Sequence, residues 1–545
     1  MLMTRRFQRL VTFTALVIVV YIVFVSPTGS GLSTLSFTEP SVTRGISPKH
    51  KGYDWVLELI LQAKPEVKPL TKYVNDEKAK QKFVTDQDMV FSEEYLDNLL
   101  MVPKQAQDTL KKEHQHYVNS VLKDQHKSFH NELDHPSGAG IIFVGGGKFS
   151  WLAYLGIEQL RQLGCELPVE VFIGSEEDYE VDFCENILPE LNARCSYLNY
   201  ETGNIVEKLG VKINGYQYKN LAFLISKFEQ ILFLDADNAP LKDPTPLFHS
   251  EVMEKYGMVL WPDAWTRTTS PKYYDIAGLK VSDEVVRGRF KDSKEKLDIK
   301  KDVTYHDREG TLPNPSSESG TILVDKTKHV KTLLLSLYYN IFGPDLYYAL
   351  LTQGAAGEGD KETFIAASTV VGTPHYQVLQ KVRFIGAHYN GNFQSKALGQ
   401  ADPIQDYRNY VMGNHYDELD ELVKVEGTED ASVEFMHMSY PKLIPFALLN
   451  NRELVNEDGG HIRMYGSITN DAGYDFELRM FELILGALCE GYDGPSSVSR
   501  RLLGLRLVEY KGRGTEDSSG QDMSQYCPQL IEHTEWLRKN PEGST

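Results

Sequence analysis

The sequence predicts an α/β fold in which a mainly parallel central sheet has flanking helices and a helical stem precedes it. A strand–helix–strand pattern begins at Ile141, and a second buried strand, 231–234, follows a helical pattern. Strands that alternate with helices form parallel sheets, which bind ligands at the carboxyl ends of their strands. The composition agrees, because 41% hydrophobic and 24% charged residues in a chain of 545 supply a sizeable core.

The N-terminal segment predicts a membrane anchor. Arginines at positions 5, 6 and 9 precede an apolar run over residues 10–25, and no acidic residue appears before Glu39. At about 1.5 Å per residue the run is about 24 Å long, which is short for a plasma-membrane span but tolerable in a thin bilayer with some help from flanking residues. Because positive charge stays on the cytosolic side, we expect a cytosolic tail (1–9), a transmembrane anchor (10–25) and a lumenal remainder. A cleaved signal peptide is the alternative.

Residues 26–137 are expected to form the stem. The chain is rich in Ser, Thr, Gly and Pro up to about Pro48, as in a flexible tether, and charged residues with scattered apolar positions follow. The run Asp-His-Pro-Ser-Gly that begins at Asp134 breaks this pattern. We therefore expect the main lumenal domain over 138–545.

A glycine run follows the first predicted strand, 141–144. Gly145 and Gly146 precede Lys148 and an amphipathic helical pattern, and a further strand is expected at 169–173. Glycines let backbone N–H groups approach a phosphate, and the N-terminus of a helix favours negative charge. We expect the two glycines and Lys148 to contact a nucleotide. A tight turn and a solvated lysine are the alternatives.

Two carboxylates follow the second predicted strand. The apolar run 231–234 leads into Asp235 and Asp237, and proline and aspartate mark a loop at 240–246. Residues two apart on an extended strand share a face, so both can bind one ion, or one can reach a ribose hydroxyl. Carboxylate oxygens suit Mg²⁺ or Mn²⁺, which also take phosphate oxygens. A helix cap or solvated loop is the alternative, but the preceding buried strand favours a metal that holds the diphosphate of a nucleotide-sugar.

The charge and the cysteines narrow the class of protein. A net charge of -19 argues against nucleic acid as a partner, because no basic excess exists to neutralise phosphates. Five cysteines are too few for a disulfide-built scaffold. Cys184 and Cys195 are close enough to close a loop, and Cys489 with Cys527 could tie down the C-terminus. Buried free cysteines are the alternative.

The sequence also resembles a known family, the fungal Golgi α-mannosyltransferases that build the outer-chain branches of N-glycans. The segment ILFLDADNAPLKDPTPLF (231–248) is similar to their signature, and so are 141–172, 261–278, ESGTILVDK (318–326), GEGDKETF (357–364) and FMHMSYPKLIP (435–445). The resemblance covers about 138–450. The α-1,2-mannosyltransferases look closest, with the α-1,3 type as the main alternative.

This resemblance implies a GT-A nucleotide-diphospho-sugar transferase fold for the catalytic domain, with GDP-mannose as donor and Mn²⁺ as cofactor. It also implies a single-pass type II protein of the Golgi membrane. In similar enzymes a late histidine completes the metal shell and a nearby lysine pairs with the diphosphate, roles that fall here on His437 and Lys442. A core or surface histidine is the alternative. Lys219, before the acidic pair, is a candidate donor contact.

Acidic and aromatic residues are expected near the acceptor. Asp263, Asp360 and Glu362 are the candidates, since a carboxylate there could accept the proton of an attacking mannose hydroxyl or support an oxocarbenium-like transition state. Asp360 is preferred, because a structural salt bridge is the alternative for Glu362. An aromatic cluster could stack on the acceptor sugar. Its members are Trp261, Trp265, Tyr273 and Tyr274.

The sequence thus predicts a retaining α-1,2-mannosyltransferase that acts on α-mannosides of cell-wall N-linked mannan. Retention requires either a covalent carboxylate intermediate or attack from the same face, and the sequence leaves both open. We expect the Golgi membrane and a mannosyltransferase complex as partners. A non-catalytic glycan-binding subunit of such a complex is the alternative, against which the intact Asp235 and Asp237 argue.

Overall fold

The computed structural model describes most of the chain: residues 51–86, 89–122, 137–203, 205–291, 293–389, 391–412, 424–489 and 523–542. The predicted cytosolic tail, anchor and tether lie outside the described residues. Within those residues, no helix combines the length and the apolar character that a membrane span requires.

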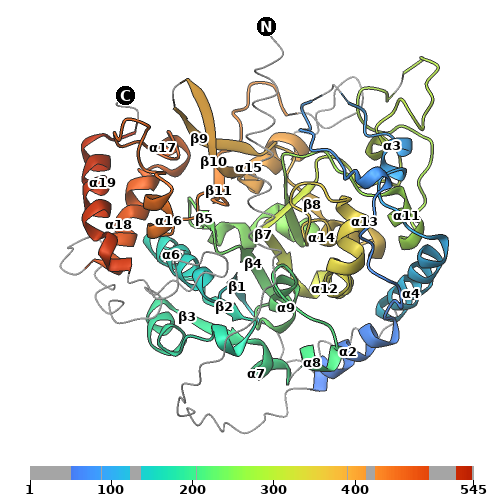
Figure 1. Ribbon diagram of the computed structural model, residues 1–545, viewed down its shortest axis with the longest axis horizontal. Helices are drawn as coiled ribbons and strands as arrows, with labels where there is room; N and C mark the ends of the chain where they lie inside the picture. The colour runs from blue at the N-terminus through green and yellow to red at the C-terminus, as the bar shows by residue number, and fades with distance from the viewer. Residues whose placement is uncertain are drawn as a thin grey trace.

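A seven-stranded sheet lies at the centre of the molecule, in the order β3-β2-β1-β4-β7-β6-β8 (Figure 1). Its strands are β1 (Ala139–Val144), β2 (Val169–Ile173), β3 (Ala193–Tyr197), β4 (Gln230–Leu234), β6 (Met258–Pro262), β7 (Ser317–Asp325) and β8 (Tyr376–Gln377). Only β7 runs antiparallel to its neighbours in this sheet. The predicted α/β fold with a mainly parallel sheet is therefore confirmed.

The two faces of the sheet pack into two separate hydrophobic cores. On β4, Leu232 and Leu234 enter one core, whereas Ile231 and Phe233 enter the other. Successive side chains of a strand point to opposite faces, so a strand covered on both sides must be apolar throughout. This is why the run before the acidic pair contains no polar residue.

Helices cover both faces of the sheet (Figure 1). The first face holds α6 (Lys148–Gln162) and α18 (Phe476–Leu488), on which α19 (Cys527–Lys539) packs; the second holds α9 (Gln217–Ile225), α12 (Lys326–Ile341) and α14 (Thr363–Val371). The shorter helices are α3 (Glu93–Asp97), α7 (Leu198–Thr202), α8 (Ile205–Leu209), α10 (Glu251–Tyr256), α11 (Pro271–Ala277), α13 (Tyr348–Thr352), α15 (Pro403–Tyr407), α16 (Pro445–Asn450) and α17 (Thr469–Ala472).

A second, antiparallel sheet adjoins the end of β4. Its order is β5-β11-β10-β9, with β5 (Asn238–Pro240), β9 (Arg383–Tyr389), β10 (Asn392–Ala401) and β11 (Val433–His437). Because β5 begins directly after Asp237 and pairs with β11, Asn238 stands opposite His437. The loop expected at 240–246 therefore follows a short strand, and this strand brings the C-terminal half of the chain to the acidic pair.

Residues 51–122, which fall within the predicted stem, pack in the main folded body. α2 (Lys51–Gln62) and α4 (Lys104–Leu122) join the core on the second face of the sheet. The Tyr117 hydroxyl donates to the carbonyl oxygen of Leu334 on α12 at 2.8 Å. The buried positions of α4 recur every three or four residues, but charged residues surround them, so they looked scattered in the sequence. These positions are Leu110, His114, Tyr117 and Val121.

The structure contains both disulfide bonds that the sequence suggested. Cys184 bonds to Cys195, and Cys489 bonds to Cys527. The first joins a helical turn after β2 to β3, and the second joins the end of α18 to the start of α19. Cys165 is a buried free thiol.

Candidate functional site

Asp235 and Asp237 lie at the carboxyl end of β4, where the strand order of the sheet reverses. The chain passes from β1 to β2 and β3 on one side and then returns to place β4 on the other side of β1. Open α/β sheets form their ligand crevice at such a point. The pair does not lie on an extended strand as expected: the N–H of Asn238 donates to the carbonyl oxygen of Asp235 at 2.8 Å, which closes a turn. The turn brings the two carboxylates together.

Three residues from two distant segments of the chain form a cluster. Asp235, Asp237 and His437 each offer one ligand atom, and these atoms lie within 4.8 Å of one another. The Nε2 atom of His437 is 3.5 Å from Oδ1 of Asp237. The N–H of Met438 donates to the carbonyl oxygen of Asp237 at 2.8 Å, so the end of β11 is fixed against the turn. The structure thus assembles the three residues predicted to bind the metal.

The cluster fits a divalent cation such as Mn²⁺. Two carboxylate oxygens and an imidazole nitrogen form a donor set that suits this ion. The side chain of Asp235 is 32% exposed, whereas those of Asp237 and His437 are 8% and 15% exposed. The cluster therefore opens to solvent beside Asp235, where oxygens of a substrate could complete the coordination of an ion.

The two carboxylates differ in their ionisation. Burial raises the pKa of Asp235 to about 6, although the Lys219 ammonium 3.3 Å away opposes this. Burial also disfavours ionised Asp237, but contacts with Lys442 and His437 outweigh it and lower the pKa of Asp237 below its usual range. Lys442 Nζ touches Oδ2 of Asp237 directly. Asp237 is therefore the carboxylate that stays charged and attracts cations.

Lys219 is a buried internal counter-ion. Its side chain is 4% exposed and its Nζ donates to the carbonyl oxygen of Ser319 at 2.7 Å. The same ammonium lies 3.0 Å from Oδ2 of Asp360 and 3.3 Å from Oδ1 of Asp235. Lys219 thus lies beside the acidic pair with its side chain almost fully buried, whereas a direct donor contact was expected of it. The lysine instead joins Asp360, which was expected near the site, to the acidic pair.

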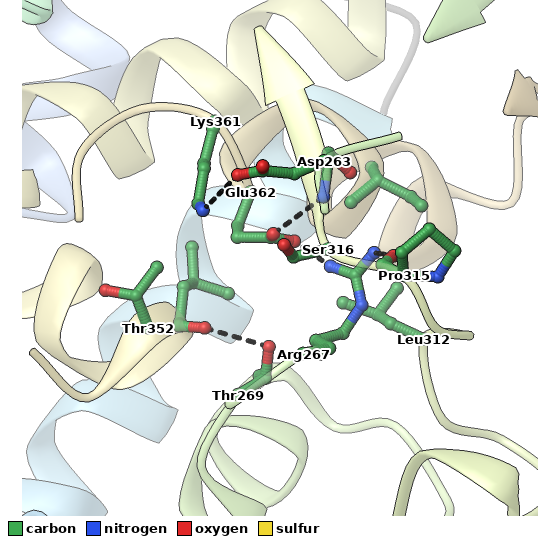
Figure 2. Close-up of polar contacts among 12 residues, drawn as sticks. Asp263, Arg267, Thr269, Leu312, Pro315, Ser316, Thr352, Lys361 and Glu362 are labelled. Atoms are coloured by element: carbon green, nitrogen blue, oxygen red, sulfur yellow. Dashed lines mark hydrogen bonds and ion pairs between the residues drawn. The ribbon is translucent and has the colours of Figure 1, made fainter. Parts of the chain in front are cut away.

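Glu362 and Asp263 are engaged in other buried ion pairs, as Figure 2 shows. Glu362 contacts Arg267, both side chains are at most 1% exposed, and the N–H of Ser317 donates to Glu362 at 2.9 Å. Lys361 donates to Asp263 at 2.8 Å. For Glu362 these contacts agree with the structural salt bridge that was the alternative to a catalytic role. Asp263, which was expected near the acceptor, is paired with Lys361 within the fold.

The glycine run serves packing. The N–H of Gly145 donates to a carbonyl oxygen of β2 at 2.8 Å, and that of Gly146 donates to Ser150 Oγ at 2.9 Å. A Cβ on Gly145 would lie 2.5 Å from Val171, and Gly146 has a φ of +103°. Because both N–H groups are bonded internally, the contacts favour the tight-turn alternative over the predicted phosphate contact for these two glycines. The side chain of Lys148 lies outside what the structure describes.

Most of the aromatic cluster expected at the acceptor is core. Trp261, Tyr273 and Tyr274 are fully buried, which contradicts a stacking role for them. Trp265 is only partly buried, and Phe83 stacks on it with ring centroids 4.5 Å apart.

Two polar residues of β7 adjoin the cluster although no sequence pattern assigned them a role. Oε1 of Glu318 lies 3.0 Å from Nδ1 of His437. The hydroxyl of Ser319 accepts from Lys219 at 2.9 Å and donates to Asp360 at 3.2 Å. Only the antiparallel pairing of β7 with β4 brings these residues to the acidic pair, so no local spacing could reveal them.

Comparison with known proteins shows the family to which the chain is related. The family model described as "Mannosyltransferase putative" matches residues 138–402. The α-1,2-mannosyltransferase MNN2 of Candida albicans is 40% identical over 504 residues, which cover 87% of this chain and 81% of that protein. The α-1,2-mannosyltransferase MNN2 of Saccharomyces cerevisiae is 38% identical over 411 residues, which cover 69% of this chain and 68% of that protein.

The chain belongs to the fungal α-1,2-mannosyltransferase family. The resemblance and the prediction of a glycosyltransferase are thereby confirmed. Solved structures similar to this mannosyltransferase include the glycosyltransferase GlyE of Streptococcus pneumoniae TIGR4, with 10% identity, a TM-score of 0.26 and coverage of 45% of this chain and 46% of that one. The galactosyltransferase LgtC gives 14% identity, a TM-score of 0.22 and coverage of 40% and 72%. Scores this low carry no argument about the site.

Proposed function

We propose that this protein is a retaining α-1,2-mannosyltransferase that transfers mannose from GDP-mannose to α-mannoside acceptors of N-linked mannan. The observation that carries the proposal is the cluster of Asp235, Asp237 and His437 at the reversal point of the sheet. The names of the relatives favour α-1,2 over α-1,3 linkage. The complete donor set argues against a non-catalytic subunit, which has no need of metal ligands.

Asp235, Asp237 and His437 would hold Mn²⁺, the cofactor that we propose. When bound there, this ion supplies a Lewis acid for the diphosphate leaving group. Lys442 is the group that can pair with a phosphate oxygen, because its side chain is 25% exposed and needs only to leave Asp237. The positive charge of Lys219 balances the negative charges of Asp235 and Asp360, so that the turn of the acidic pair stays in place during the reaction.

Attack from the same face is the form of retention that the contacts favour. A covalent intermediate needs a carboxylate that is free to reach the sugar. Of the two predicted candidates, Asp360 is ion-paired with Lys219 and Glu362 with Arg267, and both are buried. We therefore assign neither of them the role of nucleophile.

We also propose that the protein acts in the Golgi lumen as a single-pass type II membrane protein, in association with other mannosyltransferases. The arginines before the apolar run at 10–25 support this orientation. The disulfides Cys184–Cys195 and Cys489–Cys527 agree with an oxidising lumen.

A transfer assay tests the proposed activity. The full-length protein is incubated with radiolabelled GDP-mannose, Mn²⁺ and an α-mannoside, beside Asp237→Ala and the control Glu170→Gln. The control changes a buried carboxylate on β2 that is paired with Arg194 on β3. We expect the control to transfer mannose and Asp237→Ala to be slower by about 10²- to 10³-fold. Product from Asp237→Ala at the control rate, or from neither protein, would refute the proposal. Linkage analysis of the product distinguishes α-1,2 from α-1,3.

A further inference from the structure

We propose that Glu318 is a positioning residue that turns the imidazole of His437 so that Nε2 faces the metal. This inference deepens the proposed function, on which it rests, and it concerns a residue whose role no sequence pattern indicates. Glu318 lies on β7, the strand next to β4, and its side chain is 9% exposed.

The Glu318 carboxylate is fixed from two sides. Its Oε1 accepts a hydrogen bond from the N–H of Gly320 at 2.7 Å, and its Oε2 accepts from Nε2 of Gln400 at 3.4 Å. The Oε1 atom also lies 3.0 Å from Nδ1 of His437. These contacts hold the carboxylate beside Nδ1, a buried atom that makes no hydrogen bond to the described part of the chain, so Glu318 is the acceptor within reach of the ring.

The position of Glu318 decides which nitrogen of His437 can bind a metal. With Nδ1 at the carboxylate, Nε2 points to Asp237 and lies 3.5 Å from its Oδ1. A neutral imidazole carries its proton on one nitrogen, and a carboxylate at Nδ1 keeps the proton there and leaves the lone pair on Nε2. Glu318 thus selects the tautomer that completes the cluster.

Gly320 provides the space for this pair. A Cβ at Gly320 would lie 2.8 Å from Oε1 of Glu318 and 2.9 Å from Nδ1 of His437, closer than ordinary contacts. The carbonyl oxygen of Gly320 accepts from the N–H of Asp235 at 2.8 Å. Glu318 and Gly320 of β7 therefore contact both the histidine and the first aspartate, so β7 supports these two metal ligands.

The test measures Mn²⁺ affinity by the electron paramagnetic resonance signal of free Mn²⁺, with no substrate present. Full-length wild-type protein is compared with Glu318→Gln, Glu318→Ala, Asp237→Ala and the control Glu170→Gln. We expect the control to bind as wild type, Glu318→Gln about 10-fold more weakly and Glu318→Ala up to about 100-fold more weakly. The Gln side chain keeps an acceptor oxygen at Nδ1, so Glu318→Gln should lose less Mn²⁺ affinity than Glu318→Ala. A purely structural role of Glu318 would not require this difference in affinity.

Two results overturn the inference in different ways. If Glu318→Ala binds Mn²⁺ as wild type does while Asp237→Ala does not, the metal site stands and Glu318 does not position it. If Asp237→Ala also binds normally, the metal site of the proposed function is itself wrong.

A measurement on the unaltered protein covers the case in which the Glu318 variants fail to fold. With ¹⁵N-labelled histidine and saturating Mg²⁺, the signals of His437, assigned by their loss in His437→Gln, should show a protonated Nδ1 and an unprotonated Nε2. The reverse tautomer would overturn the inference.

Discussion

Lys442 and a metal ion compete for the same carboxylate. Nζ of Lys442 contacts Oδ2 of Asp237, and its side chain is 25% exposed, so the ammonium can move into solvent while the more buried Asp237 cannot follow. Lys442→Met retains the apolar stem and removes the charge. We therefore predict that this variant binds Mn²⁺ more tightly than wild type in the absence of nucleotide.

The size of the effect follows from Coulomb's law. Two unit charges about 4 Å apart interact by about 4 kcal/mol at an effective dielectric constant of about 20. Lys442 can move into solvent, where its charge is screened, so we take about 1.4 kcal/mol of this interaction energy as the free energy needed to separate Lys442 from Asp237 when Mn²⁺ binds. That energy corresponds to about a tenfold decrease in the Kd for Mn²⁺.

Titration of Mn²⁺ followed by electron paramagnetic resonance measures this change. Lys111→Met is the matched control, because Lys111 of α4 forms a partly exposed ion pair with Asp275 of α11. The control should bind Mn²⁺ as wild type does. In the presence of Mn²⁺, Lys442→Met should bind GDP more weakly, because the ammonium that pairs with the diphosphate is gone. An unchanged or weaker affinity of Lys442→Met for Mn²⁺ would refute the competition.

Three further predictions concern the supporting structure. Gly320→Ala should push the His437 ring aside and slow transfer by about 10- to 100-fold; a wild-type rate in the transfer assay would contradict this. Burial raises the pKa of Glu434 to about 8 in the folded protein. Between pH 5 and 8, roughly, the carboxyl group is therefore protonated in the folded protein and ionised in the unfolded protein, so the stability of the fold falls as the pH rises through this window. Glu434→Gln should therefore gain stability over wild type by up to about 1.4 kcal/mol per pH unit in that window; a constant difference in urea unfolding would be the contrary result. Cys489→Ala opens a disulfide between residues 38 apart, which should cost about 4 kcal/mol in thermal unfolding; an unaltered melting temperature would show that the bond adds no stability.

The parts of the site that could be predicted depend on local signals. β4 and the acidic pair follow from an apolar run that ends in two aspartates, because the run must be buried on both faces and the next residues must leave the sheet. The resemblance supplied His437, which the pairing of β11 with β5 brings to the turn. These predictions needed no knowledge of how distant strands pair.

The features of the site that the sequence could not predict depend on tertiary contacts. Glu362 looked available for catalysis because its partner Arg267 is far away in the sequence. Lys219 was expected to contact the donor, because its contacts with Ser319 and Asp360 form only in the folded chain and could not be foreseen. Glu318 could not be recognised, since its role depends on the antiparallel insertion of β7 beside β4.

The most direct test of the metal site is an anomalous difference map from crystals of the protein with Mn²⁺ and GDP, recorded at the manganese absorption edge. The account predicts a peak in contact with the carboxylates of Asp235 and Asp237 and with Nε2 of His437, and with Lys442 moved away from Asp237. A peak elsewhere, or no peak with Lys442 still on Asp237, would contradict it.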